Sequence, residues 1–112
     1  MNRRGLVRSL ALGALVALGG CLSPTLPVPP PGQPEVEGPD ASGLVTLKGA
    51  KDSAQPNAEV AAYNPATKDG RFTVSAADGS WQIVLPASSK QTLWVWQTVG
   101  FERSAQIEVR VP

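Results

Sequence analysis

The 112-residue chain contains no histidine and a single cysteine, Cys21. Without a second cysteine no internal disulfide can form, so a fold held by disulfides is excluded. Without histidine, cysteine–histidine catalysis and mixed cysteine/histidine metal sites are excluded as well. The lone cysteine needs another explanation, and the residues before it supply one.

The segment that precedes Cys21 has the three parts of a secretory signal peptide. It carries three arginines among its first eight residues, and no acidic residue comes before Glu35. Leucine, alanine and valine dominate residues 10–18, and Gly19-Gly20 follow. A basic start, a short apolar core and small residues before a cut are typical of a cleaved leader. The apolar run is about half of the ~20 residues that a permanent transmembrane helix needs.

The residues Leu18-Gly19-Gly20-Cys21 resemble the lipobox of bacterial lipoprotein precursors. The resemblance implies that residues 1–20 are a lipoprotein signal peptide, cut between Gly20 and Cys21. It also implies a diacylglycerol and an acyl chain on Cys21, and no other cofactor is expected. The alternative is an ordinary signal peptide that leaves Cys21 as a free thiol, which would be unusual in an oxidising compartment.

The same resemblance implies where the protein resides. In lipoproteins from bacteria with two membranes, a residue other than aspartate after the cysteine favours the outer membrane, and this chain has Leu22. A host with one membrane stays open, as does the side of the membrane that the protein faces. We expect a cell-envelope protein that contacts the membrane through its lipid.

The charged residues of the mature chain form no obvious cluster. Three of the ten basic residues lie in the leader, so seven remain against nine acids, a net charge of −2. Nucleic-acid binding would need a clustered basic face, and a phosphate-binding glycine-rich loop is also missing. The sequence therefore predicts no nucleic-acid partner, and it leaves the oligomeric state open.

Residues 21–42 follow the leader and are rich in proline. Seven of the eleven prolines of the chain fall between Pro24 and Pro39, and no apolar periodicity accompanies them. Such segments favour the extended polyproline II form, which rises ~3.1 Å per residue. We expect a tether of at most ~65 Å that holds a domain away from the membrane.

Residues 43–112 have the period-two pattern of a small all-β domain. Six runs of alternating apolar residues are separated by turn residues, among them Ala77-Asp78-Gly79, which joins two runs as in a tight hairpin. The alternating residues are Val45 and Leu47; Val60 and Ala62; Phe72 and Val74; Trp81, Ile83 and Leu85; Leu93 and Val95; and Ile107, Val109 and Val111. The spacing predicts a β-sandwich.

The stretches GLVTLKG, NAEVAAYNPAT and FTVSAADGSWQIVLPA resemble bacterial carboxypeptidase-regulatory-like and Ig-like sandwich domains. The resemblance covers nearly all of residues 43–112. It implies an Ig-like or prealbumin-like Greek-key sandwich of about six to seven strands, used as a spacer, an adhesion or binding module, or an accessory domain. It implies no chemistry.

Trp94 and Trp96 are the candidate binding residues. They alternate with Leu93 and Val95, so the two tryptophans share one face of a strand. If that face is outward, the rings form a strip that could stack on sugars, with Lys90, Gln97 and Arg103 as candidate polar contacts. Alternatively the tryptophans form the core, or one covers a neighbouring strand beside Tyr63. Trp81 is expected in the core.

The sequence contains no clear pattern for metal binding or catalysis. Asp52, Asp69 and Asp78 each stand alone beside glycine or serine, as turns require, whereas calcium needs clustered oxygens. The acids never pair as in glycosidases, and Ser89-Lys90 lacks any supporting motif. No metal ligand and no catalytic residue is predicted, and we expect the protein not to be an enzyme.

The sequence is consistent with two functional hypotheses. The first is a lipid-anchored, non-catalytic β-sandwich that binds an envelope protein or a cell-wall polysaccharide, or serves adhesion or structure. The alternative is an accessory subunit or domain of an envelope enzyme or secretion complex, with carbohydrate binding as one form of it.

Overall fold

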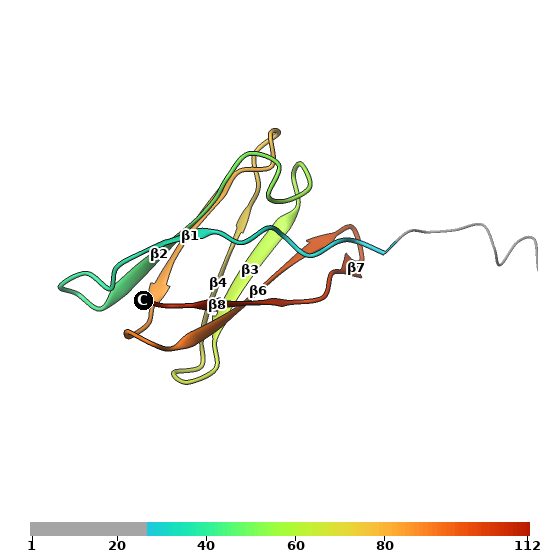
Figure 1. Cartoon of the computed structure of the whole chain (residues 1–112). Helices are drawn as coiled ribbons and strands as arrows, with labels where there is room; N and C mark the ends of the chain where they lie inside the picture. Colours follow the sequence, from blue (N-terminus) through green and yellow to red (C-terminus); the bar gives the residue numbers. More distant parts are fainter. Residues whose placement is uncertain (1–26) are drawn as a thin grey trace, which may run out of the picture.

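The computed structural model describes residues 27–112, and its regular structure is entirely β (Figure 1). The predicted leader, Cys21 and its lipid attachment lie outside the described residues. The strands are β1 (Glu35–Glu37), β2 (Leu44–Gly49), β3 (Glu59–Asn64), β4 (Asp69–Val74), β5 (Trp81–Pro86), β6 (Thr92–Val99), β7 (Glu102–Arg103) and β8 (Ile107–Arg110).

The strands form two antiparallel sheets. One has three strands in the order β1-β2-β5; the other has five, in the order β4-β3-β6-β7 with β8 paired to β6. The all-β sandwich predicted from the sequence is confirmed. All six predicted runs are strands, and β1 and β7 are additional.

The core lies between the two sheets and is apolar. The three-stranded sheet contributes Val45, Leu47, Ile83 and Leu85, and the five-stranded sheet contributes Val60, Ala62, Leu93, Val95 and Val109. Trp81 is also buried, as predicted, and its indole covers Gly49, where any Cβ would collide with the ring. The indole Nε1–H donates to Ser53 Oγ at 3.0 Å, so its polar atom is satisfied.

Strand β4 turns its large apolar residues away from this core. Phe72 and Val74 share one face of the strand, as their spacing requires, but they are 68% and 61% exposed. The register places Phe72 opposite Ala61 and Val74 opposite Glu59, both on the outward face of β3. An edge strand lies at the margin of the core, so its apolar residues need not face inward.

The turn between β4 and β5 does not join a hairpin within one sheet. Its backbone closes tightly, since Gly79 N–H donates to Ala76 O at 2.9 Å and Ala76 N–H donates to Ser80 O at 2.8 Å. Beyond it the strands separate, because β4 pairs with β3 and β5 pairs with β2. The Asp78-Gly79 turn therefore connects the two sheets of the sandwich.

The proline-rich segment is part of the folded unit over much of its described length. We call residues 29–37 the strap. Pro31 and Pro34 are buried in it, Gly32 N–H donates to Ser53 O at 2.9 Å, and β1 pairs with β2. Figure 1 shows the strap crossing the sandwich. The folded unit thus begins before Gly43, where the sequence pattern placed it, and residues 29–37 of the predicted tether belong to the domain.

The side chain of Gln97 secures the strap. Gln97 is only 1% exposed, and its Nε2–H donates to Pro29 O at 2.7 Å. Its Oε1 accepts the backbone N–H of Gln55 at 2.8 Å. One buried amide on β6 therefore joins the strap and the loop between β2 and β3.

Replacing Gln97 tests this arrangement. Gln97→Ala should lower the free energy of unfolding by about 1–3 kcal/mol, because two hydrogen bonds of a buried amide are lost and the space its side chain fills is left empty. Denaturant unfolding measures the change. The matched control is Gln82→Ala, an exposed glutamine on β5, which should change stability by less than about 0.5 kcal/mol. Equal effects of the two substitutions would show that the amide does not hold the strap.

Candidate binding face

The outward face of the five-stranded sheet carries the aromatic residues that the sequence singled out. Leu93 and Val95 are fully buried, so the pleat of β6 directs Trp94 and Trp96 to the opposite side, where both are half-buried. The tryptophans therefore lie outside the core and are not fully exposed.

The strand register adds residues from β3 and β4 to this face. Tyr63 is opposite Trp94, and Ala61 is opposite both Trp96 and Phe72. The Tyr63 and Trp94 rings lie 5.8 Å apart between centroids and are tilted by 38°. Trp94 thus packs beside Tyr63 on the neighbouring strand, as one of the alternatives from the sequence proposed.

Trp96 is held differently. The guanidinium of Arg103, on β7, lies 4.1 Å from the centroid of the Trp96 ring. A cation at this distance is attracted by the negative face of the ring and also restricts its motion. Of the three polar candidates from the sequence, only Arg103 reaches the aromatic face in this way. Gln97 points into the core, and Lys90 lies in the turn before β6.

A shallow hollow forms between these rings. It has a volume of about 320 Å³, and its lining includes Tyr63, Phe72 and Trp96 around Ala61. The hollow exists because Ala61 is small. It lies in register between the larger residues Trp96 and Phe72 and leaves space between their rings. Glu59 and Arg71 also line the hollow and offer a carboxylate and a guanidinium. We call this hollow with its three rings the aromatic hollow.

The sequence pattern did not identify two residues of the aromatic hollow as site residues. In the sequence Phe72 is one of an alternating apolar pair, and Tyr63 enters only as a neighbour of a tryptophan. A period-two pattern says which side chains share a face, but the outward direction of Phe72 follows from its register with Ala61. Only the pairing of β4 with β3 could have shown it.

The aspartates considered for calcium belong to turns. Asp52 N–H donates to Asp78 O at 2.7 Å, so two of the three turns adjoin, while Asp69 lies at the other end of β4. Hydrogen bonds from the Ser80 hydroxyl and backbone lower the pKa of the exposed Asp78 carboxyl. Over residues 27–112, no three side chains of the kinds that bind metals gather.

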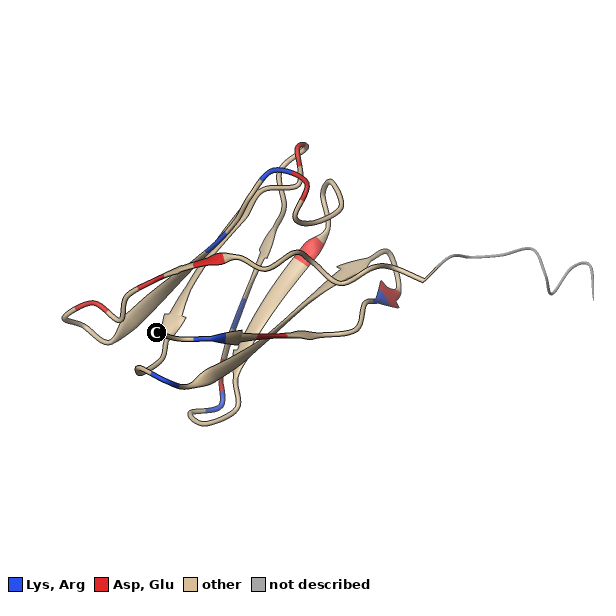
Figure 2. Ribbon diagram, in the orientation of Figure 1, with Lys and Arg blue, Asp and Glu red and all other residues tan. Residues whose placement is uncertain are grey.

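Charge on the surface is dispersed. Figure 2 shows lysine, arginine and acidic residues distributed over strands and loops of both sheets. The described part of the chain has no helix long and apolar enough to cross a membrane. Comparison with known proteins gives no match to a family model and no significant match to a curated protein.

Substitution of Phe72 tests whether this face is independent of the core. Phe72→Ser should change the free energy of unfolding by less than about 0.5 kcal/mol, because the side chain is 68% exposed. Trp81→Ser, in contrast, should lower it by about 3–5 kcal/mol, since that ring is buried. Thermal or denaturant unfolding compares them. A large loss with Phe72→Ser would mean that the aromatic hollow is structural.

Proposed function

We propose that this protein is a lipid-anchored lipoprotein of the cell envelope whose β-sandwich is a non-catalytic binding module. The ligand class that best fits the aromatic hollow is a saccharide chain of the envelope. One observation carries this assignment: Phe72 is 68% exposed beside Tyr63 and Trp96, over a floor formed by Ala61.

The chemistry of the hollow suits a sugar ring. Aromatic faces cover the apolar C–H faces of sugars, while Glu59 and Arg71 at the same hollow can bond hydroxyl groups. A stable protein interface buries about 1,200–2,000 Å² in total, whereas a hollow of about 320 Å³ is at the lower end of small-molecule sites. A hollow of this size has room for one or two sugar units.

Anchoring and the absence of catalysis are supported by the sequence. The lipobox resemblance at Leu18-Gly19-Gly20-Cys21 supports a lipid on Cys21. The chain has no histidine, so it cannot form a Ser-His-Asp triad. Its nine acids are scattered along the sequence and suggest no pair of carboxylates like that of glycosidases.

Retention on envelope polysaccharide tests the binding assignment. Phe72→Ser should weaken retention about tenfold, because one stacking ring is lost from the hollow. Affinity electrophoresis of the detergent-solubilised protein measures this. The matched control is Val84→Ser, which changes a 42% exposed residue on β5 of the other sheet and should bind as the parent does. Equal retention of all three proteins, or none by the parent, would contradict saccharide binding at this face.

Labelling tests the anchor. The parent chain should incorporate radiolabelled fatty acid and partition with membranes, because two or three acyl chains give stable attachment. Cys21→Ser removes the only thiol of the chain, so it should abolish labelling and leave a soluble or unprocessed form. Membrane retention of Cys21→Ser equal to that of the parent would show that the attachment does not depend on Cys21.

A further inference from the structure

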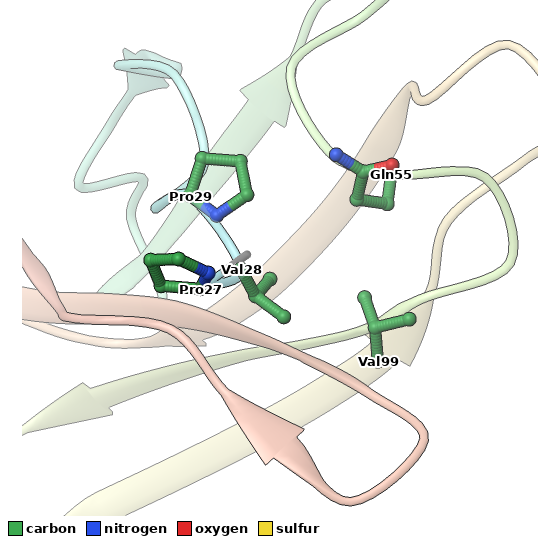
Figure 3. A pocket seen from close by; sticks show the side chains of 5 residues that line it. All are labelled: Pro27, Val28, Pro29, Gln55 and Val99. Atoms are coloured by element: carbon green, nitrogen blue, oxygen red, sulfur yellow. The ribbon is translucent and has the colours of Figure 1, made fainter. Parts of the chain in front are cut away.

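The described chain begins beside the β6–β7 hairpin. Pro29 O accepts the Gln97 amide at 2.7 Å, and Gln97 is two residues from the end of β6. Pro27, Val28 and Pro29 line one hollow of about 320 Å³ together with Gln55 and Val99 (Figure 3). Pro27, the first described residue, therefore lies at the hairpin end of the sandwich, and Figure 1 shows the described chain beginning there.

The hairpin presents an exposed aromatic residue at its tip. Val99 pairs with Glu102, so Gly100 and Phe101 form a two-residue loop. Gly100 has φ = +64°, which suits the first position of a tight hairpin turn. Phe101 is fully exposed, and Val99 behind it is 37% exposed. We call Val99, Gly100 and Phe101 the hairpin tip.

The distance to the anchor is short. Only residues 22–26 lie between Cys21 and Pro27, and six residue steps reach at most about 20–22 Å in any conformation. A lipid on Cys21 would thus hold Pro27, and the hairpin tip next to it, near the membrane surface. The strap makes this constraint stronger, because it fixes the domain to residues that would otherwise lengthen the tether.

We propose that the hairpin tip docks into the interfacial region of the membrane, with Phe101 inserted among the lipids. This proposal rests on the lipid anchor of the proposed function. Phe101 has the apolar character that an inserted residue needs, and Glu102 and Arg103 beside it carry opposite charges, so burial of apolar surface drives the contact. The anchor makes docking intramolecular, so the contact of a single aromatic residue needs less binding energy than it would in an unanchored protein.

Docking at this end leaves the aromatic hollow accessible. Trp96 precedes Val99 by three residues, which is about 10 Å along a strand. The hollow lies on the outward face of the sheet, with Glu59 at its edge nearest the tip, opposite Thr98. The β3–β4 turn lies at the far end, since Tyr63 pairs with Trp94 near the start of β6.

A fluorescent probe near the tip tests the proposal. Because Cys21 is the only cysteine and carries lipid in the anchored form, an introduced cysteine is the only free thiol. Glu102→Cys places the probe next to Phe101, and Ala66→Cys places it in the exposed β3–β4 turn as the matched control. The lipidated full chain is reconstituted into phosphatidylethanolamine and phosphatidylglycerol vesicles that contain a nitroxide lipid.

The expected result is strong quenching at position 102 and little at position 66. Adding Phe101→Ser to the Glu102→Cys chain should reduce quenching to the level of position 66. Weak quenching at position 102, or quenching unchanged by Phe101→Ser, would overturn the docking while Cys21 stays acylated. Mass spectrometry of the same samples identifies the other failure: an unmodified Cys21 would refute the anchor and the docking together.

Discussion

The buried amide of Gln97 is the interaction on which the rest of the structure depends. It satisfies Pro29 O on the strap and Gln55 N–H on the β2–β3 loop from a single side chain of β6. Breaking it would remove two hydrogen bonds of a buried amide from a small domain, where one or two kcal/mol is a large share of stability. The strap is therefore part of the sandwich, and its position decides where the chain leaves the domain.

The side chains of β6 point in two directions and contribute differently on each side. Leu93, Val95 and Gln97 face inward and hold the core and the strap, while Trp94 and Trp96 face outward beside Tyr63. The same strand thus joins the stability of the domain to the surface that we propose as its binding site. Its far end continues into the hairpin tip, so one strand connects the proposed saccharide contact with the proposed membrane contact.

Period-two spacing predicted the six strands and the sandwich, because residues such as Leu93 and Val95 can be buried together only on one face of a strand. It could not predict which face of β4 is outward, since that depends on the register of Phe72 with Ala61. The sequence pattern also could not predict that the strap packs against the sandwich. Proline-rich composition indicates an extended chain, but whether that chain is docked depends on distant partners such as Gln97 and Ser53.

Hydrogen–deuterium exchange of the strap tests the central claim most directly. Gly32 N–H donates to Ser53 O, and β1 pairs with β2, so a peptide that covers residues 32–37 should exchange slowly, as the edge of a sheet does. Gln97→Ala should accelerate its exchange more than that of β5. Exchange of this peptide in the parent protein as fast as in an unstructured chain would contradict the docked strap.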